Sequence, residues 1–175
     1  MAPPTFRDAV PADLPAVTDI QNALLGTSTY EWTDVPHTVA DKAEWLARQH
    51  HRGHPVLVAV DGDRVVGWAA YDDFRDSRRW PGYRFTVEHT VHVARSHWGR
   101  GVGRALVEQL ADRARRDGKR VMVAGIDGSN VDSISFHGRL GFHEVARLPG
   151  VGEKWGRRLD LVLMQRDLTP SGPRT

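Results

Sequence analysis

The chain has 175 residues, of which 40% are hydrophobic and 26% are charged, a composition near the average for soluble globular proteins. This balance excludes a largely disordered chain, and the absence of cysteine excludes disulfides, thiolate metal ligands and thiol nucleophiles. The formal net charge of +2 gives no argument for a nucleic-acid partner, although residues 95–120 carry eight Lys or Arg against three Asp or Glu.

The start of the chain and its hydropathy predict where the protein resides. The first residues lack a basic region followed by a long apolar run, and the chain nowhere has 18 consecutive apolar residues. We therefore expect neither secretion nor a membrane-spanning segment. Because the lack of cysteine fits a reducing compartment, we predict a cytoplasmic protein without membrane contacts.

The first part of the chain predicts a strand and two helices. Residues 6–10 read as a short strand. Residues 11–13 open a helix that carries apolar side chains at helical spacing through Leu24, and residues 26–29 end it. Thr38, with Asp41 three residues later, resembles a capping box. It predicts a second helix that extends to about His51.

A hairpin and an ordered loop are expected next. Two β-rich runs, residues 56–60 and 64–71, flank a short glycine-containing turn, which predicts an antiparallel hairpin. Residues 72–82 are polar but contain aromatic side chains, which argue against disorder. We expect an ordered loop there.

A long strand leads into the glycine-rich stretch HWGRGVGRAL. Apolar and polar residues alternate over residues 85–93, the period of a half-buried strand, so Glu88, Thr90 and His92 share one face. An amphipathic helix follows the glycines, and Gly118 closes it.

The last part of the chain completes a mixed sheet. A buried strand is predicted over residues 121–126, and Asn130 caps a helix through Leu140. Residues 142–148 and 159–164 predict two final strands around a glycine-rich turn. This order of elements predicts an α/β fold, with no internal repeat and no domain boundary. We expect one domain over residues 1–168 and a frayed tail over residues 169–175.

Gly99, Gly101 and Gly103 stand directly before a predicted helix. A helix start presents free backbone N–H groups and the positive end of the helix dipole, so it is a natural seat for phosphate. Glycines there let the backbone approach an anion. A tight strand-to-helix turn uses the same residues, so the pattern alone leaves both interpretations open.

Two common nucleotide-binding patterns are excluded. A P-loop requires Lys followed by Ser or Thr, and this pair does not occur in the chain. The dinucleotide pattern G-x-G-x-x-G fails because Arg104 or Leu106 stands where the third glycine is required. The strand before the glycines also closes an antiparallel meander. If the glycines bind phosphate, they therefore belong to a third kind of phosphate-binding loop.

Residues 91–93 and 99–103, followed by an amphipathic helix, resemble motif A of the GNAT superfamily of acyl-CoA N-acyltransferases, whose pattern is Gln/Arg-x-x-Gly-x-Gly/Ala. The resemblance covers nearly all of residues 5–168. It implies the GNAT fold, a mixed and largely antiparallel sheet flanked by helices, with acetyl-CoA as co-substrate and no metal. Trp98 departs from the pattern, since Gln or Arg is usual there.

The resemblance also implies which residues hold the cofactor. In the family, backbone groups of the central strand bind the pantetheine arm, and the N–H groups of the glycine loop bind the pyrophosphate. Arg100 and Arg104 meet phosphate oxygens or remain solvated helix charges. Asn130 contacts the cofactor, caps its helix, or does both. The implied cofactor-binding residues are Val91, His92, Val93, Gly99, Arg100, Gly101, Val102, Gly103, Arg104, Asn130 and Ser133.

Finer features resemble the phosphinothricin N-acetyltransferase branch, which acetylates the α-amino group of amino acids such as phosphinothricin and methionine sulfoximine. The matching segments are residues 27–29, Phe74-Arg75 with Tyr83, residues 86–93, Asn130 with Ser133, residues 137–142 and residues 151–157. The stretch between Arg75 and Tyr83 is slightly longer than in that branch. The substrate-binding residues implied are Thr29, Phe74, Arg75, Tyr83 and Thr90.

Glu88 and His137 are the candidate catalytic residues. An acceptor ammonium must lose a proton before it attacks a thioester, so Glu88 is the candidate base, directly or through water. An exposed strand glutamate is the alternative. His137 is a candidate proton donor to the leaving thiolate, and packing or capping within its helix is the alternative.

Arg75 offers two N–H groups to a substrate carboxylate, with Tyr83 as a hydrogen-bond partner, unless both merely order their loop. His50, His51 and His54 lie at a helix end and lack the spacing of a metal site. Trp32 lies in the predicted substrate loop.

The predicted function is therefore direct transfer of an acetyl group from acetyl-CoA to the α-amino group of a small amino acid or analogue. Two alternatives stay open, a GNAT enzyme acting on another amine such as a polyamine or a protein terminus, and a non-catalytic acyl-CoA sensor. Arg75 disfavours a purely cationic acceptor because it would leave no anion to pair. The resemblance also implies a homodimer. The physiological acceptor, and with it any role in herbicide or antibiotic resistance, is left open.

Overall fold

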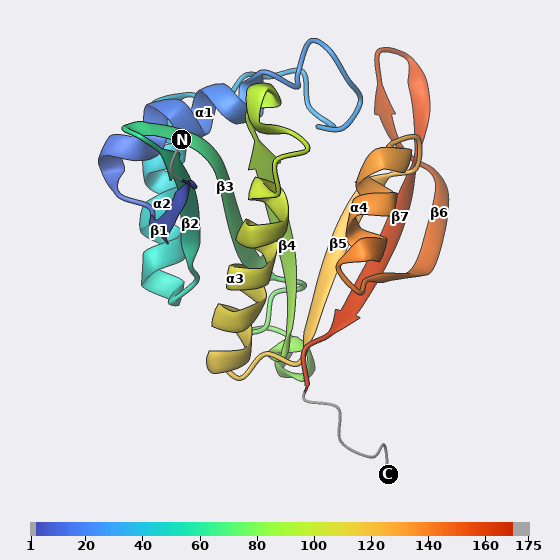
Figure 1. Ribbon diagram of the computed structural model, residues 1–175. Helices are drawn as coiled ribbons and strands as arrows, with labels where there is room; N and C mark the ends of the chain where they lie inside the picture. Colours follow the sequence, from blue (N-terminus) through green and yellow to red (C-terminus); the bar gives the residue numbers. More distant parts are fainter. Residues whose placement is uncertain (1–2, 170–175) are drawn as a thin grey trace.

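In the computed structural model, which describes residues 3–169, a seven-stranded sheet forms the centre of the molecule (Figure 1). Its strand order is β1-β2-β3-β4-β5-β7-β6, and every neighbouring pair is antiparallel except β4–β5. The strands are β1 (Thr5–Asp8), β2 (Val56–Asp61), β3 (Arg64–Asp73), β4 (Thr86–Val93), β5 (Val121–Asp127), β6 (His143–Lys154) and β7 (Arg157–Asp167). The helices are α1 (Leu14–Asn22), α2 (Val39–Arg52), α3 (Val102–Arg116) and α4 (Val131–Arg139).

The sheet divides between its two parallel strands. β4 and β5 pair only over Thr86–Glu88 and Val121–Val123, and beyond these residues the two ribbons diverge (Figure 1). Glu88 is the last residue of β4 that pairs with β5. From there on, one backbone edge of β4 has no neighbouring strand.

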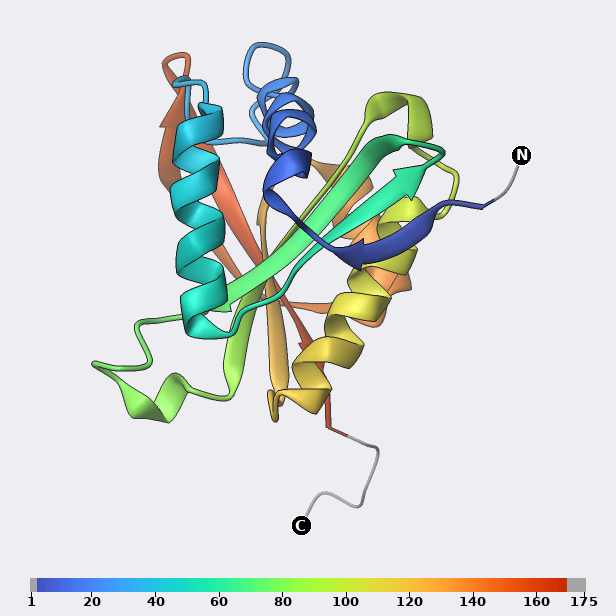
Figure 2. The same cartoon turned by 90° about the vertical axis from the view of Figure 1, so that its left-hand side faces the viewer.

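Helices cover both faces of the sheet, and each face has its own core (Figure 2). α3 buries an apolar stripe against one face, and α1 and α2 pack over β2 to β4 on the other. Leu106, Val107 and Leu110 of α3 are completely buried. On the opposite face Trp68 is 2% exposed. These two layers fix the position of β4.

The predicted element order and the predicted mixed, largely antiparallel sheet are confirmed. The capping box is present, since Thr38 Oγ1 accepts from Asp41 N at 3.1 Å and α2 begins at the next residue. Asn130 caps α4 by accepting from Ser133 N at 3.0 Å. Gly118, just past α3, has the left-handed φ of 74° that suits glycine after a helix.

Most strands and α1 differ from their predicted bounds by a few residues. β1 ends at Asp8, two residues earlier than predicted. Residues 11–13, predicted to open the first helix, form a separate 3-10 turn, and α1 ends at Asn22, before Leu24. The predicted glycine-rich turn between the last strands is wrong, because β6 continues through Gly150 and Gly152 and the turn lies at Trp155 and Gly156.

A bulge in β6 stands where the turn was predicted. Leu148 pairs with Leu161 and Gly152 with Leu159, so four steps along β6 match two along β7. Gly150, with φ 60°, lies within the extra residues. A bulge and a turn both favour glycine, so the composition of this segment did not distinguish them.

Among residues 3–169, no helix has the length and apolar character needed to cross a bilayer. Of the predicted frayed tail, only Thr169 is among the described residues, and it donates from its N–H and its hydroxyl to Asp167.

Candidate active site

A cleft of about 660 Å³ opens where β4 and β5 diverge, within the usual size range of a small-molecule site. Its walls come from β4, β5, the glycine loop, α4 and the loop between α1 and α2. The predicted site residues that line it are Thr90, Val91, His92, Val93, Gly99, Gly101, Val102, Gly103, Arg104, Asn130, Ser133 and His137. Those not among its lining residues are Thr29, Phe74, Arg75, Tyr83, Glu88 and Arg100.

The glycine loop presents free amides to this cleft. Gly99 and Gly101 have φ values of 72° and 82°, which favour glycine, and Gly101 is the residue before α3. The first helical hydrogen bond runs from Ala105 N to Gly101 O, so the three preceding N–H groups of α3 lack a helical partner. The glycines therefore shape the turn, and that turn leaves an anion-binding helix start at the cleft.

The open edge of β4 supplies further backbone groups. Ala94 N donates to Val66 O of the β3 side, and strand residues alternate in direction, so the N–H and C=O groups of Val91 and Val93 point away from β3. Both residues line the cleft. An extended ligand with amide groups can pair with this edge as a neighbouring strand would.

Trp98, the departure from the motif, is bound to the same edge. Its indole Nε1 donates to Val93 O at 2.7 Å, while 52% of the residue is exposed. The ring therefore ties the entrance of the glycine loop to the end of β4.

Glu88 lies at the point where the sheet opens. Its neighbours Val87 and His89 are buried toward α3, so its own side chain points to the opposite face. Burial raises the pKa of the Glu88 carboxyl above the ordinary glutamate value. Glu88 Oε1 lies 2.8 Å from the position that a Cβ on Gly125 would occupy, so this glycine provides the space that the carboxylate fills.

His137 is 4% exposed, and its ring packs against Phe142 and His89, with ring centroids 5.2 and 5.1 Å away. His137 Nδ1 lies 2.8 Å from Ser133 O, and since a carbonyl only accepts, Nδ1 carries the proton. Burial lowers the pKa of His137, so Nε2 holds a lone pair in the neutral ring. This geometry favours packing over proton donation.

His89 is more strongly perturbed. Burial, with a contribution from the neighbouring His137, lowers its pKa to about 3. Neither of its ring nitrogens has a hydrogen-bond partner. At neutral pH the floor of the cleft thus carries two uncharged imidazoles.

The residues predicted to bind the acceptor form two groups. Phe74, Arg75 and Tyr83 cluster in the loop between β3 and β4, where the Arg75 guanidinium lies 5.6 and 5.9 Å from the two ring centroids. This loop projects from the face that carries α2 (Figure 2). Glu88 points to the same face, and it is the third residue of β4, the strand that begins directly after this loop.

Thr29 belongs to the second group. It is 6% exposed and hydrogen-bonded to Asp127, which also accepts from Trp32 Nε1 at 3.3 Å. The loop between α1 and α2 is therefore attached to the end of β5. Thr29 holds that loop in place.

The same loop is attached to β4 through a second carboxylate. Glu31 Oε1 lies 3.1 Å from His92 Nε2, and Gln21 Nε2 donates to Glu31 Oε2 at 3.2 Å. Burial alone raises the pKa of Glu31, but the His92 imidazole brings it below the ordinary glutamate value. Glu31 and His92 both line the cleft.

A sequence model described as the acetyltransferase (GNAT) family matches residues 17–142. The chain belongs to the GNAT family of acetyltransferases. It is 44% identical over 165 residues to an L-methionine sulfoximine/L-methionine sulfone acetyltransferase of Salmonella typhimurium, covering 94% of each protein. It is 35% identical over 165 residues to a phosphinothricin N-acetyltransferase of Alcaligenes faecalis, covering 94% of this chain and 82% of that one.

Solved structures agree with these relatives. A putative acetyltransferase from Salmonella typhimurium, determined with its cofactor acetyl-CoA, superposes with a TM-score of 0.90 at 40% identity and covers 99% of both chains. The predicted GNAT fold, the resemblance to the phosphinothricin branch and the class of acetyl-CoA-dependent N-acetyltransferase are confirmed.

The groups that surround the cleft of this GNAT enzyme suit acetyl-CoA, independently of the similarity to its relatives. The unpaired amides at the start of α3 suit a pyrophosphate, and the free edge of β4 suits the amides of a pantetheine arm. Arg104 and Arg139 both line the cleft and add positive charge to it.

Several residues at the site carry no recognisable sequence signal. Gly125, Asp127, Glu31 and Arg139 act through neighbours that lie far away in the chain. Among residues 3–169 no three His, Asp or Glu side chains are arranged to hold a metal. His54 instead lies 3.3 Å from Asp72.

Proposed function

We propose that this GNAT enzyme acetylates the α-amino group of a small amino acid or analogue, of the methionine sulfoximine or phosphinothricin kind, by direct transfer from acetyl-CoA. The observation that carries the proposal is the place of Glu88. A carboxyl group with a raised pKa stands where β4 and β5 separate, next to the backbone edge that suits a pantetheine arm. The names of the relatives support the acceptor class.

In this proposal the chain holds the cofactor mainly through backbone. The N–H groups of the glycine loop and of the first turn of α3 bind the pyrophosphate, and Val91 and Val93 bind the pantetheine arm. The same strand edge polarises the acyl carbonyl, because fixed backbone donors stabilise developing negative charge. The cofactor-binding set is Val91, His92, Val93, Gly99, Arg100, Gly101, Val102, Gly103, Arg104, Asn130 and Ser133.

Glu88 accepts the proton that the acceptor ammonium must lose, directly or through one water. Burial raises the pKa of Glu88, and a carboxylate with a raised pKa is a stronger base. His137 remains a candidate for stabilising the leaving thiolate, but its neutral, buried ring supports a packing role more strongly.

Arg75 pairs with the acceptor carboxylate, and the rings of Phe74 and Tyr83 form the rest of the acceptor site on this loop. The Arg75 guanidinium lies near both rings, and among residues 3–169 no carboxylate forms an ion pair with it, so its N–H groups suit an anionic ligand. Thr90 lies on the strand face of Glu88, and Thr29 anchors the opposite loop.

A thiol-release assay with acetyl-CoA and a panel of amines tests the proposal. We expect turnover with methionine sulfoximine or phosphinothricin and little with polyamines. Turnover with polyamines or peptide termini alone would favour the second enzyme class. CoA binding without turnover on any amine would identify an acyl-CoA sensor.

Arg75→Ala tests the acceptor assignment. We expect the KM for a carboxylate-bearing acceptor to rise about 30-fold, as a charged hydrogen bond is lost, with an unchanged KM for acetyl-CoA. The matched control is Arg78→Ala, which removes an exposed cation from the same loop. Equal effects of both variants would contradict a specific role for Arg75.

The proposal also covers the domain organisation, the oligomeric state and the location of the protein. We take residues 1–168 as one catalytic domain, we expect a homodimer by analogy with the branch, and we place the protein in the cytoplasm. Sedimentation equilibrium of the full chain tests the dimer, and a single species of monomer mass would exclude it. Resistance of cells that express the chain to phosphinothricin or methionine sulfoximine tests the physiological role.

A further inference from the structure

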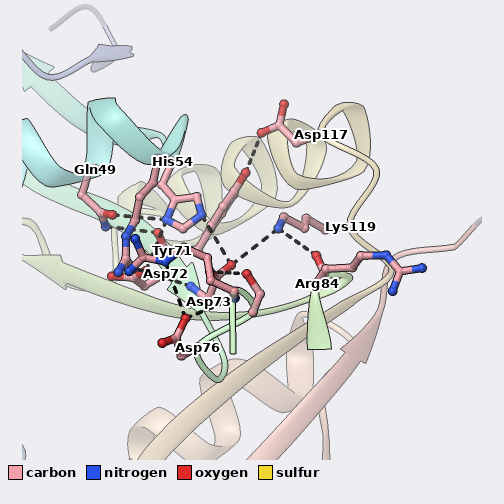
Figure 3. A network of polar contacts seen from close by, with 12 residues as sticks. Gln49, His54, Tyr71, Asp72, Asp73, Asp76, Arg84, Asp117 and Lys119 are labelled. Carbon is pink, nitrogen blue, oxygen red and sulfur yellow. Dashed lines mark hydrogen bonds and ion pairs between the residues drawn. The ribbon is translucent and has the colours of Figure 1, made fainter. Parts of the chain in front are cut away.

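One half-buried lysine, Lys119, connects the two ends of the loop that carries the proposed acceptor residues. Lys119 Nζ donates to Arg84 O at 2.9 Å, at the end of the loop, and lies 3.7 Å from Asp73 Oδ1, at its start (Figure 3). The side chains of Lys119 and Asp73 are each 15% exposed. Ion pairs shielded from solvent in this way are screened less than surface pairs.

The start of the loop is held from other elements as well. Asp73 Oδ2 accepts from Ser77 Oγ at 2.8 Å inside the loop, and His54 lies beside both Asp72 and Asp73. Arg52, the last residue of α2, pairs with Asp72 Oδ1 at 2.8 Å. Figure 3 shows these groups converging from α2, β3 and the turn after α3.

The position of Lys119 is itself fixed by the end of α3. Gly118 adopts a left-handed φ of 74°, and Lys119 N then donates to Ala114 O at 2.9 Å, which closes the helix. Next to it, Tyr71 OH donates to Asp117 Oδ2 at 2.5 Å, which ties the helix end to β3. The ammonium group thus reaches the loop from a rigid base.

The loop buries little of its own surface, so contacts from other elements help to order it. Its residues are mostly exposed, including Trp80 at 54% and Tyr83 at 41%. Holding both ends at one point reduces the conformations open to Arg75, and a recognition group that is ordered beforehand loses less entropy when it binds.

We propose that Lys119 is a positioning residue for acceptor recognition, which holds Phe74, Arg75 and Tyr83 in their binding arrangement by bridging Asp73 and the Arg84 carbonyl. This inference rests on the proposed function, since it concerns the same loop. Lys119 touches neither substrate, and it acts only through the loop.

The test compares Lys119→Met with the matched control Arg116→Met, which removes an exposed cation from the last residue of α3, three residues before Lys119. We expect Lys119→Met to raise the KM for the amino acid acceptor about tenfold, with kcat and the KM for acetyl-CoA within about twofold of wild type. Lys119→Arg, which keeps the charge, restores part of the acceptor KM. Amide hydrogen exchange over residues 74–84 becomes faster in Lys119→Met and is unchanged in the control.

An unchanged acceptor KM in Lys119→Met, or an equal rise in both KM values, would overturn the inference. If Lys119→Met does not fold, Asp73→Asn takes its place, because it keeps the hydrogen bond from Ser77 and loses only the charge; no change in its acceptor KM overturns the inference too. A wild-type protein that acetylates no amino acid refutes the proposed function instead, and hydrogen exchange then still reports whether Lys119 orders the loop.

Discussion

Gly125→Ala is expected to separate catalysis from stability. Gly125 of β5 faces Glu88, and an added Cβ would lie 2.8 Å from Glu88 Oε1. Ordinary contact begins at 3.4 Å, so the carboxylate oxygen must move by about 0.6 Å, the difference between the two distances. The other neighbours of the new methyl group, Leu161 and Leu163, lie at 3.5 and 4.0 Å and need not move.

The fold should tolerate this change. Gly125 has no left-handed φ, and the group that must yield is the end of a flexible side chain. Alanine in a strand is favoured over glycine by about 0.5–1 kcal/mol, so the melting temperature should hold or rise slightly. The rate should fall, because misplacing a reacting group by about 1 Å costs up to about 100-fold. For a shift of about 0.6 Å we expect kcat to fall about tenfold.

The assay is thiol release at saturating acetyl-CoA and acceptor, combined with a thermal melt. Gly138→Ala is the control, because a Cβ there meets nothing within 4 Å. The decisive comparison is the double variant with Glu88→Gln, in which the alanine should cost little more, since the group it displaces has already lost its function. Wild-type kcat in Gly125→Ala, or an equal tenfold loss in the Glu88→Gln background, would refute the reasoning.

Two further substitutions test the catalytic base and the support of the cleft. Glu88→Gln should lower kcat at pH 7 by about 100-fold, as expected for a lost general base. A base works deprotonated, so the raised pKa of Glu88 predicts that wild-type kcat falls on acidification at a higher pH than an ordinary glutamate would give; the pH profile of Glu88→Gln should lack this limb, and its retention would remove Glu88 from the role. Lys154→Met should lower the free energy of unfolding by about 3 kcal/mol in urea titrations, because three carbonyl groups lose the buried ammonium that donates to them, and a loss below about 1 kcal/mol would contradict this.

The order of elements was predictable because its signals are local. A capping box such as Thr38 with Asp41 involves residues three apart, and Gly118 ends its helix through its own φ. The alternation over β4 likewise predicted correctly that Glu88 and Val87 face opposite sides. Where a local signal is ambiguous, as at Gly150, the prediction failed, since a bulge and a turn require the same backbone freedom.

The candidate site was predictable only where resemblance or backbone pattern carried it. The glycine loop and the edge of β4 are continuous segments, and the cleft contains them as expected. The space that Gly125 leaves for Glu88 joins residues that are adjacent only after β4 and β5 pair. The bond from Trp98 to Val93 spans five residues, yet it requires a rotamer that no periodicity encodes.

Side-chain contacts cross the open end of the cleft and join β4, on one side, to β6 and β7, on the other. Lys154 of β6, with its side chain 1% exposed, donates to Glu31 O at 2.7 Å, and the carboxylate of the same glutamate faces His92 of β4 at 3.1 Å. One residue therefore connects the β6–β7 arm to the β4 arm. β4 and β5 share only three paired residues at the closed end of the cleft. The contacts of Glu31 join the two strands' sides again at the open end, so the width of the cleft depends on the strand pairing and on Glu31.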